Sequence, residues 1–285
     1  MNLQPLVSIG IPTYNRPEGL EKALKYLINQ CYKNLEIIVS DNCSTNPDVK
    51  KILAHYSTID DRIIFFTQKE NILSEPNFNF VFHQAKGNYF MWIADDDDFD
   101  DNYISECVSF LELHQDYVLC SGVSAYYKGD QLLFRENRIE LSNNNPFFRL
   151  FKYYKKVFKN GVFYGVYRNN LGFINPIQNH VASDWNHIAR TALLGKIQVL
   201  DSITVKRSDD GGSSSRGKMT TRWHLKGIKK LFFETYTAVQ IVKYLFNEPI
   251  FKKKYSTLTK GIIQAILFFM LNLKFLIHSI KIRIK

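Results

Sequence analysis

Cysteine and proline are scarce in this chain of 285 residues, which has four cysteines and eight prolines. The thiols of Cys31, Cys43, Cys107 and Cys120 show neither CxxC spacing nor pairing with histidine, which argues against a structural zinc site. Four scattered thiols in a chain of this length fit a reducing cytoplasm better than a disulfide framework. The first residues lack a basic segment followed by an apolar one, so we expect no signal peptide.

Acidic residues are also scarce, but only in the last quarter of the chain. Residues 219–285 hold 13 basic and 2 acidic side chains, whereas residues 1–218 hold 24 basic and 25 acidic ones, and the net charge is +10. Such an excess predicts an anionic partner, either nucleic acid, a membrane surface or a phosphorylated ligand. The contents of 45% apolar and 22% charged residues exclude a disordered or collagen-like chain.

Apolar runs alternate with helical patterns over residues 1–127. The expected strands are Leu6–Ile11, Leu35–Ser40, Arg62–Thr67, Tyr89–Ala94 and Val118–Tyr126. The expected helices are Pro17–Gln30, Pro47–Tyr56, Asn77–Lys86 and Asp101–His114. This alternation predicts an α/β fold with a parallel sheet, and ligands of such sheets bind beyond the carboxyl ends of the strands.

The remainder of the chain is mixed and then helical. A helix is expected near Pro146–Val157, a strand near Gly161–Tyr167, a helix near Ser183–Leu194, and strand pieces near Ile197–Leu200 and Ile203–Lys206. Residues 208–218 are polar and rich in glycine, which predicts a loop, and from Met219 the pattern is helical with a break near Pro249. We therefore predict a catalytic domain over 1–218, with parts 1–127 and 128–218, and a basic helical region over 219–285.

Polar clusters follow three of the expected strands. Four carboxylates, Asp95–Asp98, come directly after the apolar run that ends at Ile93, where a divalent cation would relieve their mutual repulsion. The alternative is a solvated acidic turn that caps the next helix. Asp41 and the segment Pro12–Arg16 follow two other strands, and each on its own is also typical of a turn.

Together these segments resemble a known family. The succession Ile-Pro-Thr-Tyr-Asn-Arg, Ile-Val-Ser-Asp-Asn-Cys-Ser and Gly-Asn-Tyr-Phe-Met-Trp-Ile-Ala-Asp-Asp-Asp-Asp is similar to that of the inverting glycosyltransferases of family 2. The resemblance covers roughly residues 5–210. It implies the GT-A fold, a Rossmann-like, mostly parallel sheet flanked by helices, which binds a nucleotide sugar.

The resemblance also implies roles for the donor side of the site. The residues that would contact the donor nucleotide are Pro12, Thr13, Tyr14, Asn15, Arg16, Asp41, Asn71 and Asp95, and the position of Arg207 before a glycine-rich loop adds it to the donor-binding residues. Among them, Thr13 and Asp41 would contact the uracil or other base, and Asp95 the ribose. Ala94 stands where many members carry the first aspartate of the Asp-x-Asp motif. The ligand of Mn²⁺ or Mg²⁺ therefore stays open among Asp95–Asp97, with Asp96 favoured and Asp97 next.

The family's catalytic base is an acid that opens a helix well downstream. Asp184 matches it, with Ser183 in place of the preceding acid, and it would take the proton of the acceptor hydroxyl. The alternative is that Asp184 caps the helix, and His180 and His187 are rival bases. Arg207 and the loop 208–218, with Arg216 and Lys218 near the diphosphate, would close over the donor as a lid.

The basic C-terminal segment predicts an amphipathic helix. On a helical wheel the polar residues fall in one arc, and these are Lys260, Gln264, Lys274, His278, Lys281 and Lys285. Apolar residues lie opposite, and Lys252–Lys254 precede the helix. We expect residues 250–285 to lie in the plane of an anionic membrane surface. The alternatives are packing on the catalytic domain or on a second copy in a homodimer. Nucleic acid is disfavoured because the aromatic residues lie on the apolar side.

The sequence thus predicts a metal-dependent, inverting glycosyltransferase that moves a sugar from a nucleotide-diphosphate sugar, by resemblance a UDP-sugar, to a hydroxyl of a glycan or lipid-linked acceptor. It would act in bacterial polysaccharide or lipooligosaccharide synthesis, at the cytoplasmic face of the membrane. The rival predictions are a nucleotidyltransferase, which would need a glycine-rich phosphate loop that Pro12–Arg16 does not supply, and a non-catalytic membrane-associated module.

Overall fold

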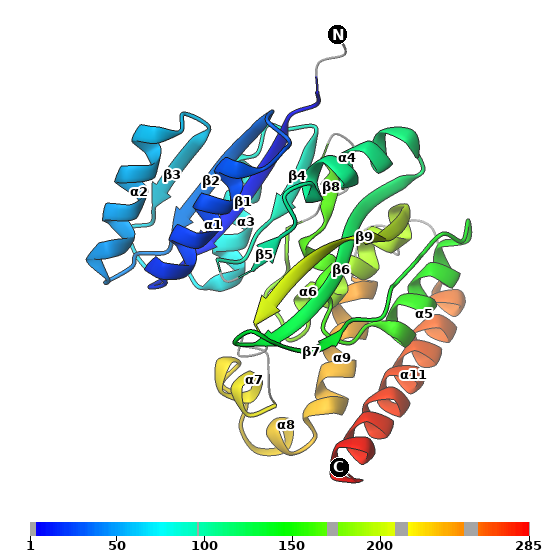
Figure 1. Cartoon of the computed structure of the whole chain (residues 1–285). Coiled ribbons are helices and arrows are strands. Elements are labelled where there is room, and N and C mark those ends of the chain that lie inside the picture. The colour runs from blue at the N-terminus through cyan, green and yellow to red at the C-terminus, as the bar shows by residue number, and fades with distance from the viewer. Residues whose placement is uncertain (1–3, 96, 170–175, 209–215, 248–255, 285) are drawn as a thin grey trace.

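The computed structural model describes residues 4–95, 97–169, 176–208, 216–247 and 256–284, and its centre is one β-sheet with helices on both faces (Figure 1). The strands are β1 (Val7–Thr13), β2 (Leu35–Asp41), β3 (Ile63–Thr67), β4 (Tyr89–Trp92), β5 (Asp98–Phe99), β6 (Tyr117–Lys128), β7 (Gln131–Arg135), β8 (Val166–Arg168) and β9 (Lys196–Ser208). The helices are α1 (Pro17–Asn29), α2 (Pro47–Ile59), α3 (Ser74–Gln84), α4 (Tyr103–Leu113), α5 (Pro146–Lys156), α6 (Ser183–Leu194), α7 (Arg216–Arg222), α8 (Gly227–Leu231), α9 (Phe233–Phe246) and α11 (Thr257–Ile284). The predicted α/β class is confirmed.

The strands follow the order β3-β2-β1-β4-β8-β6-β9-β5 across the sheet, with β7 beside β6. The first four are parallel, as the strand–helix alternation predicts. Beyond β4 the sheet is mixed, because β8 runs antiparallel to both β4 and β6, and β5 runs antiparallel to β9. Parallel β1, β2 and β4 therefore end at one edge, where the polar clusters follow them.

Two predicted segments differ from the structure. Residues Gly161–Tyr164 form a 3₁₀ turn, so the strand expected near Gly161–Tyr167 is reduced to β8. The Glu136 carboxylate accepts the backbone N–H groups of Asn160 and Gly161 at 3.0 and 2.9 Å, which bends this segment away from the sheet. The two strand pieces expected near 197–206 are one strand, β9, whose register against β6 shifts between Gly122 and Val123.

A hydrophobic core lies on each face of the sheet. Successive residues of a strand point to opposite faces, so Ile37 and Val39 join the core under α1, α2 and α4, while Ile38 joins the other core. That second core lies between the sheet and α3, α5, α6, α9 and α11. The near-continuous apolar runs in the first strands are explained by this coverage of both faces.

The C-terminal helix α11 packs on α9 and α5 through Ile263, Leu267 and Leu271, all buried. Lys274, which belongs to the polar arc of the helical wheel, lies on the packed side of this helix. Lys274 Nζ donates to the backbone carbonyls of Tyr154, at 2.8 Å, and Val157. A lysine fits there because the carbonyls at the end of α5 lack partners within that helix. The division predicted at residue 218 stays a prediction.

Candidate active site

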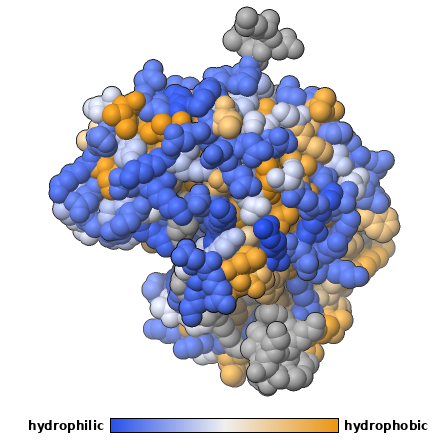
Figure 2. Space-filling view, in the orientation of Figure 1, coloured by the Kyte–Doolittle hydropathy of each residue, from blue (hydrophilic) through white to orange (hydrophobic). Residues whose placement is uncertain are grey.

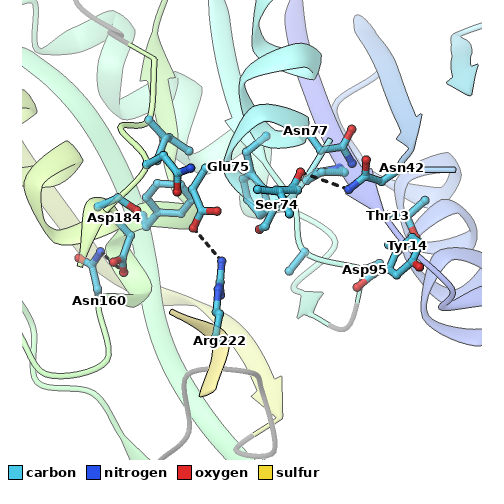
Figure 3. A pocket seen from close by; sticks show the side chains of 18 of the residues that line it. Thr13, Tyr14, Asn42, Ser74, Glu75, Asn77, Asp95, Asn160, Asp184 and Arg222 are labelled. Carbon is cyan, nitrogen blue, oxygen red and sulfur yellow. Dashed lines mark hydrogen bonds and ion pairs between the residues drawn. The ribbon is translucent and has the colours of Figure 1, made fainter. Parts of the chain in front are cut away.

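A cavity of about 690 Å³ opens at the carboxyl ends of β1, β2 and β4. Figure 3 shows Thr13, Asn42 and Asp95 along one side of it and Asn160 and Asp184 along the other. The two sides come from the parallel and the mixed part of the sheet. Of the residues that the sequence predicts for donor, metal and base, those that line this cavity are Pro12, Thr13, Tyr14, Arg16, Asn71, Asp95, Asp184 and Arg207. Asn15, Asp41 and Asp97 are described but do not line it.

The first loop, after β1, holds the start of the acidic cluster. Pro12, Thr13, Tyr14 and Arg16 line the cavity. Thr13 Oγ1 donates to Asp95 Oδ2 at 2.9 Å, and Arg16 Nη1 pairs with Asp95 Oδ1 at 2.7 Å. The loop thus orients the Asp95 carboxylate toward the cavity that both elements line.

Asn15 does not line the cavity but joins two loops. Its backbone has a φ of 54°, in the left-handed region that asparagine tolerates. Its side-chain oxygen accepts the backbone N–H groups of Thr45 and Asn46 at 2.8 and 3.0 Å. The position of the first loop relative to the loop after β2 depends on this residue.

Asp41 ends β2, Asn42 follows it, and Asn71 lies in the loop between β3 and α3. Asp41 is fully buried; its Oδ1 accepts the N–H of Ser44 at 3.0 Å, and its Oδ2 has no hydrogen-bond partner among the described residues. Asn42 Nδ2 donates to Asn71 Oδ1 at 3.1 Å, and both asparagines line the cavity. A buried carboxylate oxygen without a partner is costly, so Asp41 is suited to accept a donor group from a ligand.

The acidic cluster is split between the cavity and an internal ion pair. Asp95 lines the cavity, whereas Asp97 is 3% exposed and pairs with Arg207 Nε at 3.1 Å. Burial alone would lower the pKa of Arg207, but the Asp97 carboxylate holds that pKa above its ordinary value. The Arg207 guanidinium also lies 4.4 Å from the centre of the Tyr164 ring. Asp96 lies outside the described residues.

The described residues can supply one or two carboxylate ligands to a hard cation, but no larger set of ligands. Among them no group of three or more histidine, cysteine or acidic side chains is arranged to hold a metal ion. Mg²⁺ and Mn²⁺ sites of transferases commonly use one or two carboxylates together with substrate phosphates. Asp95, at the cavity wall, offers oxygen ligands of that kind.

Asp184 lies on the opposite side, in the first turn of α6. Its Oδ2 accepts Asn160 Nδ2 at 3.0 Å, and burial raises the pKa of this carboxyl, while the Asn160 hydrogen bond acts in the other direction. Asn160 is held in turn, since Tyr153 donates its hydroxyl to Asn160 Oδ1 at 2.7 Å. A carboxylate with a raised pKa is a better proton acceptor than an exposed one.

The rival bases do not line the cavity. His180 is 3% exposed and stacks on Tyr244 at 4.1 Å between ring centres, and burial lowers its pKa to about 4. His187 is 1% exposed and packs edge-on against Trp92, and burial lowers its pKa well below the ordinary range. Both imidazoles belong to the core next to α6.

Several cavity residues escaped the sequence analysis. Glu75 Oε1 on α3 pairs with Arg222 Nη2 on α7 at 2.7 Å, which joins two elements 147 residues apart (Figure 3). Trp223 and His224 follow α7 and also line the cavity, as does Lys159. The sequence offers one signal for these residues, which is that Arg222–His224 place a cation and two aromatic rings shortly after a polar loop. The loop residues 209–215 lie outside the described residues, and so do the side-chain surroundings of Arg216.

The fold and this site together define an α/β sugar-transferase domain of the GT-A class. The model of glycosyl transferase family 2 matches residues 8–172, more than half of the chain. The chain belongs to this family, and the resemblance inferred from its motifs is confirmed.

Two bacterial proteins are similar to this chain by sequence. The GalNAc(5)-diNAcBac-PP-undecaprenol beta-1,3-glucosyltransferase of Campylobacter jejuni is 41% identical over 96 residues, which is 33% of this chain and 30% of that protein. The putative teichuronic acid biosynthesis glycosyltransferase TuaG of Bacillus subtilis is 29% identical over 110 residues, 39% of this chain and 43% of that protein. The matches thus span less than half the length of either relative.

Solved structures agree on the fold over nearly the whole chain. Residues 1–349 of S. aureus TarS, in complex with UDP-GlcNAc, superpose with a TM-score of 0.63 at 17% identity, over 92% of this chain and 71% of that one. The mannosyltransferase PcManGT of Pyrobaculum calidifontis, in complex with GDP-Man and Mn²⁺, superposes with a TM-score of 0.57 at 12% identity, over 96% of this chain and 87% of that one. At such low identity these likenesses establish the GT-A fold.

Proposed function

We propose that this protein catalyses the metal-dependent, inverting transfer of a sugar from a nucleotide-diphosphate sugar to a hydroxyl group of a glycan or lipid-linked acceptor. A UDP-sugar is the preferred donor class, and bacterial surface polysaccharide or lipooligosaccharide synthesis is the setting. The observation that carries the proposal is that Asp95 and Asp184 lie on opposite sides of one cavity of about 690 Å³. Relatives that act on undecaprenol-linked and teichuronic acid glycans support the setting.

The donor is assigned to the side formed by the first two loops. Asp41 Oδ2, buried without a partner, would accept an N–H group of the base. Thr13, Asn42 and Asn71 line the adjoining wall. A neighbouring fold that binds UDP-GlcNAc supports a uridine nucleotide in this place.

A divalent cation, Mn²⁺ or Mg²⁺, is assigned to the acidic cluster. Asp95 would hold it, with Asp96 and Asp97 as further candidates, although Asp97 would first have to exchange its ion pair with Arg207. The bound ion would neutralise charge on the departing diphosphate. A neighbouring fold with bound Mn²⁺ supports this assignment.

The acceptor side is assigned to Asp184. Its carboxylate would take the proton of the acceptor hydroxyl while the hydroxyl oxygen forms a bond to the anomeric carbon. The bond between that carbon and the diphosphate oxygen breaks, and its electron pair leaves with the nucleoside diphosphate. Attack from the side opposite the leaving group inverts the anomeric centre.

The experiment follows release of UDP from a panel of UDP-sugars, with Mn²⁺ or with a chelator, in full-length protein. Wild type should release UDP only with the metal, and the variants Asp184→Asn and Asp95→Asn should lose turnover. Asp61→Asn, at an exposed position, is the matched control. Thermal stabilisation by UDP should survive in Asp184→Asn, because that residue belongs to the acceptor side.

Two outcomes would replace the proposal. Formation of UTP and a sugar 1-phosphate when pyrophosphate is added to the UDP-sugar, in place of UDP release, would identify a nucleotidyltransferase. Stabilisation by no nucleotide, together with binding to membranes, would identify a non-catalytic module. We further propose a cytoplasmic protein that associates peripherally with the inner face of the cell membrane, with a homodimer as the alternative role of the C-terminal helix.

A further inference from the structure

The segment Lys226–Phe232, which contains α8, is exposed along its whole length. Ile228 is 74% exposed, Leu231 69% and Phe232 55%, and α8 has no buried residue. Short helices are marginal in water unless an apolar face packs against something. This segment therefore presents an apolar surface that the described part of the protein does not cover.

A second apolar surface runs along α11 on the side away from the core. Its members, the α11 stripe, are between 45% and 76% exposed and are Leu258, Ile262, Ile266, Phe269, Leu273, Leu276 and Ile277. They recur every three or four residues and so lie on one face of the helix. The helix is thus apolar on its outer side as well as on the side that packs on the core. Figure 2 shows hydrophobic surface at the lower end of the molecule and along its lower right edge, over α11.

Positively charged side chains lie beside both apolar surfaces and favour one kind of partner. Lys226, Lys229 and Lys230 are exposed within the α8 segment, which has no acidic residue. Lys155 and Lys156, at the end of α5, are exposed next to the turn of α11 that carries Lys274. A symmetric contact with a second copy would bring these lysines together, whereas an anionic lipid surface attracts each of them.

We propose that the α8 segment and the α11 stripe form one docking surface for an anionic lipid bilayer, with α11 lying in the membrane plane. By length and composition, Thr257–Ile277 is long and apolar enough to cross a membrane. Crossing would require α11 to leave α9 and α5 and to break the hydrogen bonds of Lys274. The in-plane arrangement keeps those contacts and inserts only the exposed face.

The docking surface lies next to the acceptor side of the cavity. Arg222, Trp223 and His224 line the cavity, and α8 begins three residues later. A bilayer against α8 would thus lie next to the part of the cavity wall that Arg222, Trp223 and His224 form. This inference rests on the proposed function. Given that function, it narrows the acceptor to a sugar carried on a membrane-embedded lipid.

The test is flotation of the full-length protein with vesicles of phosphatidylcholine alone or with 30% phosphatidylglycerol. The wild type should float with the anionic vesicles, and Lys229→Glu/Lys230→Glu should lower the partition coefficient by about tenfold or more. Phe269→Ser/Leu273→Ser should lower it as well, on both kinds of vesicle. Leu113→Ser, which removes a 79% exposed apolar side chain from α4, should leave it unchanged.

Three results would overturn the inference. The wild type could stay in the lower fraction with anionic vesicles, or the lysine variant could float like the wild type. The third is a homodimer in solution that Phe269→Ser/Leu273→Ser dissociates without a change in vesicle binding. UDP release, measured on the same preparations without lipid, reports separately on the proposed function. A rejected docking surface therefore leaves the proposed function untouched, and a rejected function leaves the docking surface untouched.

Discussion

Asn160 Nδ2 lies 3.0 Å from Asp184 Oδ2, and Asn160 itself has a φ of 61°. Glu136 fixes this strained backbone by accepting the N–H groups of Lys159, Asn160 and Gly161. Asp184 is thereby positioned by a chain of contacts that begins in the segment after β7. The position of the Asp184 carboxylate therefore depends on Glu136, which does not line the cavity.

The first prediction concerns this contact. Asn160→Ala removes a hydrogen bond that lowers the pKa of Asp184, so that pKa should rise further above its ordinary value. Because the base must be ionised, the acidic limb of the kcat/KM profile should move to higher pH, by about one unit. Asn29→Ala, at an exposed helix end, is the control. An unchanged profile would show that Asn160 does not tune the base.

A second prediction uses a close approach of two backbones. An added Cβ at Gly19 in α1 would lie 2.2 Å from the backbone oxygen of Asp95. Gly19→Ala should therefore displace the acidic turn, destabilise the protein by about 1–3 kcal/mol and weaken nucleotide binding. Gly261→Ala, where a Cβ meets nothing within 4 Å, is the control and should be neutral or slightly stabilising. Urea unfolding and titration with UDP measure the two effects.

The third prediction concerns the pair Glu75–Arg222, which links α3 to α7. Its side chains are 12% and 40% exposed, so solvent screens the attraction, and a double-mutant cycle should give a coupling of at most about 1 kcal/mol in stability. Glu75→Gln should affect function more than stability, since it loosens the α7 rim of the cavity. We expect a higher acceptor KM with little change in kcat. A coupling well above that value would mean that the pair stabilises the fold itself.

A fourth prediction follows from Lys274. Burial lowers its pKa from 10.5 to about 8, so between these values the unfolded chain binds a proton that the folded protein does not. Stability should therefore rise with pH across this window, and fall as pH drops through 8, by at most about 3 kcal/mol from this group. Lys274→Met should show a smaller rise between pH 7 and pH 10. Comparing the two proteins in urea cancels the titration of the tyrosines, which they share.

The sequence predicted the strands β1, β2 and β4 and the helix α6 well, because both faces of those strands are buried and α6 has clear ends at Ser183 and Leu194. It also predicted β3 from its apolar run, although Ile64 and Phe65 are partly exposed. It placed Asp95 and Asp184 at one site only through the family resemblance, since nothing local links two residues so far apart. The Glu75–Arg222 pair was missed for the same reason. The 3₁₀ turn at Gly161–Tyr164 was missed because its cause, the Glu136 carboxylate, lies 25 residues away.

The hydrogen bonds of Lys274 make the last helix part of the structure that supports α5. A protein shortened at residue 250 would lose the ammonium group that satisfies the final carbonyls of α5 and would expose Leu245, which the same core buries. Such a truncation would change the folding of the catalytic part along with any affinity for lipid. Deleting this helix is therefore an unsuitable way to obtain a smaller active enzyme, and surface substitutions along its outer face are the sound route.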